Sequence, residues 1–215
     1  MLVKFALAAV MAIGVLGRTV PERDRFFTSA YCGSGNIQQA RDSVSTFDQC
    51  LKDIYTEESF TNEVTLAQLN NNQDKIVKAF CDRSSQLKAC SQPLITNISP
   101  CFTATELRIY QQQFYKIVDF FCGNDAAKAI SFVKEGGYVC LEQANFASCR
   151  NNTQSEITRL IDVYGSGPAI PEKERCKIDQ QENACETAIM KDCAKPNLDK
   201  IIDELVNAVD IKCEE

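Results

Sequence analysis

Apolar residues recur along this chain with the period of an α-helix. Three long stretches space them at alternating steps of three and four, which places them on one face of a helix. The long stretches cover residues 37–54, 107–121 and 198–209, and shorter ones cover 74–80, 126–133 and 157–164. No stretch shows the strict alternation of apolar and polar residues that a half-buried strand requires. The pattern therefore predicts an all-α fold of about six to nine helices.

Signals for helix ends and turns lie between these stretches. Thr103 and Glu106 have the spacing of a capping box at the start of a helix. Asparagine- and glycine-rich loops are predicted at 70–72, 136–137 and 165–168. The last loop favours a boundary before a C-terminal helical lobe, 172–215, although the helices of that segment could equally belong to one core.

The first residues have the layout of a secretory signal peptide. A basic residue, Lys4, precedes twelve uncharged and mostly apolar residues, 5–16, and a polar stretch begins at Arg18. The alternative is a membrane anchor, but twelve helical residues span about 18 Å, short of the roughly 30 Å hydrocarbon core. Residues 1–17 are therefore predicted to be a signal peptide. Residues 18–215 are predicted to form a single domain of a secreted protein that has no membrane anchor.

The chain has twelve cysteines and no histidine. An even number of cysteines in an exported chain indicates a disulfide framework. All twelve are candidates for bridges: Cys32, Cys50, Cys81, Cys90, Cys101, Cys122, Cys140, Cys149, Cys176, Cys185, Cys193 and Cys213. The sequence therefore predicts a disulfide-stapled multi-helix bundle. No metal is expected, since an all-cysteine zinc site is unfavourable in an oxidising compartment.

The spacing of the cysteines indicates a helical-hairpin pseudo-repeat. Cysteines 81, 90, 101 and 122 are separated by 8, 10 and 20 residues, and cysteines 176, 185, 193 and 213 by 8, 7 and 19. Each set ends with one of the long amphipathic stretches. We therefore expect two similar helical hairpins, although the spacing could also arise by chance.

Geometry limits how these cysteines can pair. A bridge holds two Cα atoms within about 7 Å, whereas the helix predicted between Cys101 and Cys122 is about 28 Å long. These two cysteines therefore cannot pair with each other. In an antiparallel hairpin the end of the second helix returns beside the start of the first. That arrangement favours Cys90 with Cys122, and Cys185 with Cys213, as hypotheses.

Charge and residue types argue against several classes of function. The formal net charge of −6 is unfavourable for binding nucleic acid or an anionic membrane surface. Without histidine, Ser-His-Asp and Cys-His catalytic sites cannot form. No Walker loop, dinucleotide fingerprint or EF-hand loop occurs in the sequence. We therefore expect neither an enzyme nor a bound cofactor, and the sequence leaves the oligomeric state open.

Two kinds of candidate site remain. Asn97 and Asn151 each begin a sequon for N-linked glycosylation. One face of a predicted helix also gathers large side chains, Tyr110, Phe114, Ile117 and Phe121. Such a stripe is most often part of the core. A rigid disulfide framework could instead hold it open as the wall of an apolar pocket, and the pattern does not separate the two.

Several cysteines stand within longer motifs from residue 80 onward. These are Phe80-Cys81, Leu87-Lys88-Ala89-Cys90, Pro100-Cys101, Asp119-Phe120-Phe121-Cys122, the run 132–137 followed by Cys140, and the last four cysteines. In these motifs the chain resembles an insect family, the 27 kDa hemolymph glycoproteins. The resemblance implies a secreted and often glycosylated protein of insect body fluid. It implies no established activity and no catalytic residues.

These observations favour a secreted, non-enzymatic binding or carrier glycoprotein for an apolar small molecule or lipid. The alternative is a secreted glycoprotein that has no ligand cavity and acts through its surface on another protein, in immunity, signalling or a host. A ligand that co-purifies with the protein would favour the first function. A fully packed core would favour the second.

Overall fold

The computed structural model describes residues 32–137, 139–140, 147–165, 169–193 and 195–209. Within these ranges every element is a helix. The α-helices are α3 (Gly33–Thr56), α4 (Glu58–Leu69), α5 (Gln73–Cys81), α6 (Ser84–Asn97), α7 (Ala104–Lys134), α9 (Ala147–Tyr164), α10 (Glu172–Cys193) and α11 (Pro196–Val209), and a 3-10 helix, η1, covers Ser99–Cys101. The predicted all-α class is confirmed. The predicted signal peptide, 1–17, lies outside the described residues.

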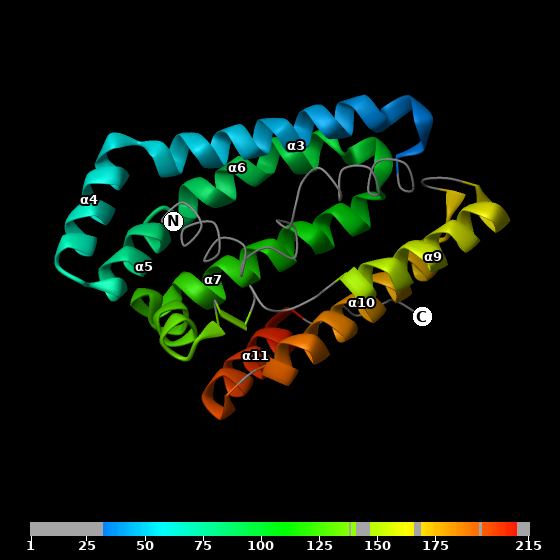
Figure 1. The fold of residues 1–215 in the computed structure, drawn as a ribbon. Helices are drawn as coiled ribbons and strands as arrows, with labels where there is room; N and C mark the ends of the chain where they lie inside the picture. Colours follow the sequence, from blue (N-terminus) through cyan, green and yellow to red (C-terminus); the bar gives the residue numbers. More distant parts are fainter. Residues whose placement is uncertain (1–31, 138, 141–146, 166–168, 194, 210–215) are drawn as a thin grey trace.

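The helices form an elongated bundle (Figure 1). The long helix α3 lies beside α6, and α4 and α5 form one end of the molecule. The longest helix, α7, runs along the middle and contacts α5, α6 and α11, whereas α9 packs against α10. Helices far apart in the sequence are therefore joined through α7.

The main apolar core surrounds the middle and the end of α7. Its buried members are Val77, Cys81, Leu87, Phe114, Ile117, Val118, Phe121, Ala126, Ala129, Phe132, Cys140, Leu198, Ile201 and Ile202. The last three belong to α11, which is amphipathic as its sequence predicted. A helix of the segment 172–215 therefore shares one core with α7.

Two smaller clusters lie toward the ends of the bundle. One joins the start of α3, η1, α9 and α10 through residues such as Cys32, Phe102, Ile157 and Ile178. The other fastens α4 to α5, where the rings of Phe60 and Phe80 pack edge to face with their centroids 4.7 Å apart. The bundle therefore has apolar contacts along its whole length.

Helix α7 is broken in its second half. Gly123 has an extended backbone, and Asn124, Asp125 and Ala126 have positive φ angles of 49°, 57° and 61°. Non-glycine residues adopt this region at a cost, which is smallest for Asn and Asp. The helical pattern in the sequence stops at Phe121 and resumes at Ala126. The apolar pattern therefore already contained the break that divides α7 into two helical segments.

In the described part of the chain, four disulfides with both partners identified connect the helices. They are Cys32–Cys101, Cys50–Cys90, Cys81–Cys122 and Cys149–Cys185. Cys140 and Cys176 are disulfide-bonded as well. The bridges therefore fasten α3 to η1 and α6, α5 to α7, and α9 to α10. A disulfide-stapled bundle is confirmed.

Both specific pairings favoured by the sequence are wrong. Cys90 pairs with Cys50 instead of Cys122, because it lies in the middle of α6 and faces α3. Cys122 pairs with Cys81 at the end of α5. Cys185 pairs with Cys149 of α9. This pairing excludes the predicted bridge to Cys213, a residue that lies outside the described ranges. The exclusion of a bridge between Cys101 and Cys122 is confirmed.

Glycines end two of the helices where the backbone requires them. Gly136 follows α7 with a φ of 84°, and Gly165 follows α9 with a φ of 87°. A side chain at Gly137 would meet the ring of Phe132 at 2.5 Å. The predicted loop at 136–137 is therefore both a helix stop and a close approach of backbone to the core.

Candidate functional site

A cluster of buried and partly buried polar side chains forms where α10 packs against the first turns of α7. The capping box predicted at the start of α7 is present. Glu106 Oε2 accepts from the backbone N–H of Thr103 at 2.7 Å, and Thr103 Oγ1 accepts from the N–H of Glu106 at 3.2 Å. The hydroxyl of Thr103 in turn donates to Glu172 at the start of α10, at 3.2 Å. A local capping motif thus also takes part in a tertiary contact.

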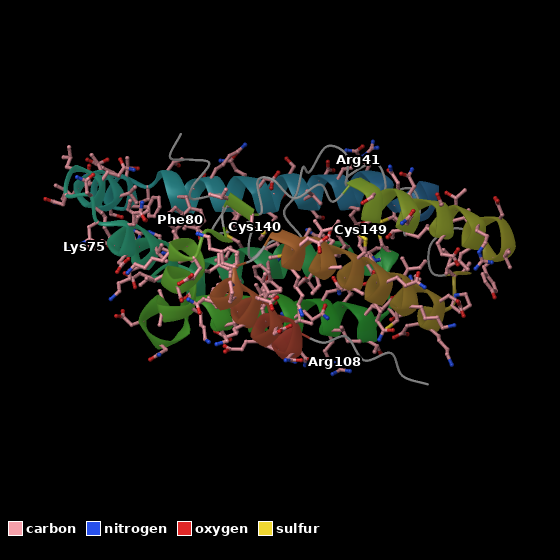
Figure 2. The ribbon with its side chains drawn as sticks, turned by 60° about the horizontal axis from the view of Figure 1, so that its bottom comes forward. Arg41, Lys75, Phe80, Arg108, Cys140 and Cys149 are labelled. Atoms are coloured by element: carbon pink, nitrogen blue, oxygen red, sulfur yellow. A yellow bond between two sulfur atoms is a disulfide. The ribbon has the colours of Figure 1, made fainter. Side chains whose placement is uncertain are left out.

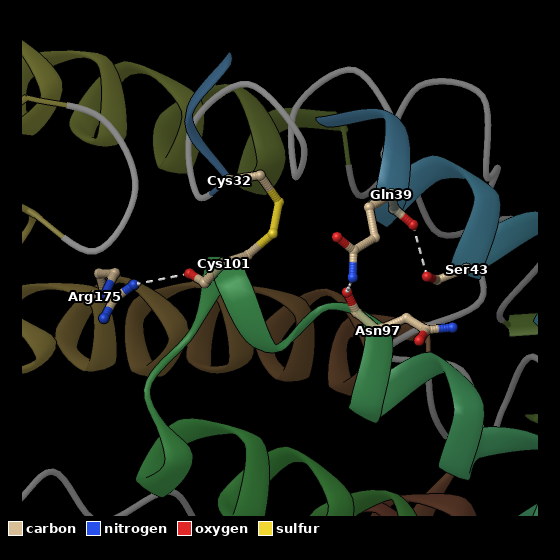
Figure 3. Close-up of a disulfide and its surroundings, with 6 residues drawn as sticks. All are labelled: Cys32, Gln39, Ser43, Asn97, Cys101 and Arg175. Atoms are coloured by element: carbon tan, nitrogen blue, oxygen red, sulfur yellow. Dashed lines mark hydrogen bonds between the residues drawn. A yellow bond between two sulfur atoms is a disulfide. The ribbon is translucent and has the colours of Figure 1, made fainter. Parts of the chain in front are cut away.

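Arg175 of α10 is the centre of this cluster. Its residue is 1% exposed, and Nη2 lies 2.8 Å from Oε2 of Glu106, which is 5% exposed. Nη1 donates to the backbone carbonyl of Cys101 at 3.4 Å, beside the Cys32–Cys101 disulfide (Figure 3). Such a buried pair is costly to break, because the remaining charge has neither water nor a partner. Arg175 therefore ties α10 to α7 and η1.

Asp179, one turn after Arg175, forms the second contact of the cluster. Tyr110 of α7 donates its hydroxyl to Asp179 Oδ2 at 2.6 Å. Burial raises the pKa of Asp179 from 3.8 to about 7, and the nearby carboxylates of Glu182 and Glu106 act in the same direction. The hydrogen bond from Tyr110 and the charge of Arg175 oppose that shift. The pKa of Glu106 is also raised, chiefly by burial.

We name this cluster of Thr103, Glu106, Tyr110, Arg175 and Asp179 the charged seam. Carboxyl groups with raised pKa values occur at catalytic sites, but structural ion-pair networks shift pKa values too. Neither of the two surface hollows described below includes a residue of the seam. The contacts of the seam join α10 to the first turns of α7.

The proposed pocket residues separate into two environments. Tyr110 belongs to the charged seam, whereas Phe114, Ile117 and Phe121 are buried in the main core. The ring of Phe121 packs edge to face on Phe132 with centroids 5.4 Å apart. Side chains occupy the space between the helices along the bundle (Figure 2). The face that could have lined a pocket is therefore covered by helices of the same chain.

Two hollows of the described residues lie open on the surface, and most of the residues that line them are polar, although Ala127 and Ile130 also line the second. The first, about 500 Å³, follows the exposed face of α9 and is lined by Asn151, Gln154, Ser155 and Thr158. The second, about 690 Å³, lies between the start of α5 and the break in α7. Its rim carries three lysines and two aspartates, of which Lys78 pairs with Asp125, and Lys134 with Asp74 at 2.8 Å.

One predicted glycosylation site lies at the end of a helix and the other lies inside a helix. Asn97 is the last residue of α6, and its backbone carbonyl accepts from the side chain of Gln39 at 3.0 Å (Figure 3). Asn151 is exposed within α9, at the edge of the first hollow. Thr153 of the same sequon is instead buried.

Sequence reasoning found only part of the charged seam. The capping-box spacing located Glu106, and the apolar stripe included Tyr110. Arg175 and Asp179 were missed because charged residues on a largely polar helix are normally solvated. Their spacing of four, with Ile178 between them, was the available signal, since residues four apart share a helix face. This spacing indicates a buried polar face only when it is known that α7 packs against that face of α10.

Within the described ranges, no helix combines the length and apolar composition needed to cross a bilayer. The same ranges contain no group of His, Cys, Asp or Glu side chains that could hold a metal ion. The fold and its bridges thus define a class: a cysteine-rich, all-α protein stapled by disulfides. Because such bridges persist in oxidising compartments outside the cytosol, the protein is secreted and extracellular.

The chain belongs to the family described as "Protein of unknown function (DUF1397)", whose model matches residues 28–213. It is 24% identical to the "27 kDa glycoprotein" of Bombyx mori, over 96% of this chain and 92% of that protein. It is 20% identical to the "27 kDa hemolymph protein" of Galleria mellonella and to the "27 kDa hemolymph glycoprotein" of Manduca sexta, over 97% of this chain and 94% of each relative. The resemblance stated from the cysteine motifs is confirmed. No solved structure matches the chain.

Proposed function

We propose that the protein is a non-enzymatic glycoprotein of insect hemolymph that acts through its surface on another protein. The names of its relatives support the fluid and the glycosylation. The observation that carries the proposal is the position of Phe114, Ile117 and Phe121. These side chains are the best candidates for an apolar pocket wall, and they are instead packed in the main core.

A carrier of an apolar small molecule or lipid is the second candidate function. Ligand pockets of this kind are concave and mostly apolar, with a few polar groups that orient the ligand. The two surface hollows are open instead of enclosed, and polar or charged residues form most of their linings, although Ala127 and Ile130 also line the second. The surface-acting function therefore has the better support.

The tip of α4 supplies a candidate contact surface for such a partner. Leu69 is 76% exposed and Leu66 is 61% exposed, and residues three apart lie on the same face of a helix. The opposite face of α4 buries Phe60 and Ala67. Isolated exposed leucines are common, but two on one face of a helix already anchored by its other face form a small apolar knob.

Native mass spectrometry distinguishes the two functions. The protein is isolated from hemolymph, trimmed of glycans, and measured before and after solvent extraction. We expect the bare polypeptide mass in both measurements. An extractable mass identified as fatty acid, sterol or terpenoid would overturn the surface-acting function in favour of the carrier.

The contact surface is tested by chemical cross-linking in cell-free hemolymph. The variant Leu66→Asp/Leu69→Asp is compared with Val163→Asp, whose side chain is 61% exposed on α9. We expect the first variant to lose the cross-linked partner and the second to keep it. Equal retention by both variants would exclude the tip of α4 as the contact surface.

A further inference from the structure

The sequon at Asn151 lies on helix α9, which exposes one of its two essential residues, Asn151, and buries the other, Thr153. The side chain of Asn151 is exposed and borders the first hollow, together with Gln154, Ser155 and Thr158. These residues follow at steps of three, four and seven, so they continue the same face of α9. A glycan on Asn151 would therefore have a polar surface along which to lie.

Thr153 faces the interior of the protein. Its residue is 7% exposed, and its hydroxyl donates to the backbone carbonyl of Cys149 at 3.0 Å. Cys149 is itself 1% exposed and is bonded to Cys185 of α10. The hydroxyl that completes the sequon is thus covered by the packing that the disulfide secures.

Helix geometry prevents these two residues from acting together. The transferase that attaches N-linked glycans must hold the amide of the asparagine and the hydroxyl two residues later in one site. On a helix, residues two apart do not face each other. A sequon is accordingly expected in a surface loop, whereas residues 151–153 lie inside the 18-residue helix α9.

We propose that Asn151 carries an N-linked glycan that is attached before α9 folds against α10 and before Cys149 and Cys185 close their bridge. After attachment the helix forms, Thr153 turns inward, and the glycan remains on the exposed polar face. The modification is therefore made on the unfolded chain and is compatible with the folded one. This inference specifies the glycosylation named in the proposed function, and it does not depend on whether the protein acts through its surface.

The chemistry requires a lipid-pyrophosphate-linked oligosaccharide as donor. The side-chain amide nitrogen of Asn151 forms a bond with the anomeric carbon of the first sugar and loses a proton. The bond between that carbon and the phosphate oxygen breaks, and the lipid pyrophosphate leaves. No oxidation or reduction accompanies the transfer. The later closure of Cys149 and Cys185 is a separate oxidation, in which two thiols give up two electrons and two protons to the oxidant of the secretory compartment.

The first test compares folded and unfolded acceptors in vitro. The mature chain is produced with its disulfides in a bacterial periplasm, where it carries no eukaryotic glycan. It is then offered, either folded or reduced and denatured, to purified oligosaccharyltransferase with lipid-linked donor. Glycosidase treatment in heavy-oxygen water, followed by peptide mass spectrometry, reads the occupancy of Asn151. We expect Asn151 to receive glycan in the reduced and denatured protein and to receive little or none in the folded protein.

Two disulfide variants show whether the bridge is responsible. Cys149→Ser/Cys185→Ser removes the bridge beside the sequon, which spans 36 residues of sequence, and Cys50→Ser/Cys90→Ser removes a bridge of similar span, 40 residues, on the other helices. Under oxidising conditions we expect the first variant to accept more glycan at Asn151 than the wild type. The second should accept no more than the wild type.

Two results would overturn the inference. One is an Asn151 without glycan in the protein secreted from insect cells. The other is equal transfer to the folded and the reduced wild-type protein. If the variant that lacks Cys149 and Cys185 does not fold, the wild-type comparison still decides the question, because it needs no substitution.

Discussion

The two ends of α7 are held in the bundle by different interactions, polar ones near its start and apolar packing farther along. Near its start, Glu106 and Tyr110 meet Arg175 and Asp179 in the charged seam. Farther along, Phe121 and its neighbours meet the apolar face of α11. Apolar contacts tolerate repacking and are insensitive to pH, whereas a buried ion pair is specific, intolerant of losing one partner, and sensitive to proton concentration. Helix α7 therefore has one contact that tolerates substitution and another that does not tolerate the loss of a partner.

The largest expected effect comes from removing half of the buried ion pair. Arg175→Met keeps most of the side-chain volume but leaves Glu106 buried without its partner, so the free energy of unfolding should fall by about 3–5 kcal/mol. Chemical denaturation measures the loss. Adding Glu106→Gln to the variant should recover part of the lost stability, because position 106 then no longer carries an unpaired buried charge.

A matched control for this substitution is Lys177→Met on the same helix. Lys177 pairs with Glu174 at 2.9 Å on the exposed surface, where such pairs contribute about 0–1 kcal/mol. Equal losses for Arg175→Met and Lys177→Met would contradict the special role of the seam.

The pH dependence of the seam is expected to reside largely in Asp179. Its pKa rises from 3.8 to about 7 on folding, so between these values the folded protein keeps a proton that the unfolded chain has lost. Stability contributed at this residue therefore falls as pH rises through that window and levels off above it.

The variant Asp179→Asn stays neutral, yet its amide oxygen can still accept from Tyr110. Relative to the wild type it should gain stability between pH 4 and pH 8, on the order of 1–2 kcal/mol after allowance for partial solvent exposure. Unfolding midpoints across this range measure the gain. The absence of histidine from the chain removes the usual competing titration. Parallel curves for variant and wild type would contradict the assignment.

The apolar end should respond to substitution without any dependence on pH. Ile117→Val removes one buried methylene from the main core and should lower the free energy of unfolding by about 0.5–1.5 kcal/mol. Denaturation at pH 5 and pH 8 should give the same difference between variant and wild type. A difference that changes with pH would mean that the two ends of α7 are coupled.

The smallest expected effect concerns the break in α7, which lies within the apolar half of the helix. Asp119 and Asp125 are both exposed residues of α7 that pair with a lysine, but Asp119 is helical and Asp125 has a φ of 57°. Asp119→Gly should cost a few tenths of a kcal/mol in helix propensity, because glycine is about 1 and aspartate about 0.7 kcal/mol less favourable than alanine inside a helix. Asp125→Gly should cost less, because glycine adopts positive φ without steric penalty. Thermal unfolding measures the loss of stability in both variants. Equal losses would contradict the non-helical backbone at Asp125.

Sequence reasoning recovered the helices that bury an apolar stripe. The stripe at 198–209 became α11, and the capping box at Thr103 marks the start of α7. Helix α4 was missed although Phe60, Val64 and Ala67 carry the right spacing. In α6 the internal Pro93 hides the pattern, because proline normally ends a helix.

The apolar pattern did not locate helix α10, although the hairpin repeat implied a helix before 198–209. The reason for this also explains why the seam was missed. The buried face of α10 includes Arg175 as well as Ile178, so the face that packs inward contains a charge. A pattern search assigns charged residues to the solvent, and no local signal corrects this. The carboxylate of Glu106, 69 residues away from Arg175 along the chain, and the backbone carbonyl of Cys101 make the burial of the arginine tolerable.

The sequence by itself determined the all-α class, the disulfide framework and the absence of histidine chemistry, because periodicity and composition are local properties. The tertiary structure alone decided which cysteines pair and whether the stripe of Phe114, Ile117 and Phe121 is a wall or a core. It also decided that Arg175 is buried. Each of these depends on which helix lies opposite, and that is fixed by packing between segments distant in the chain.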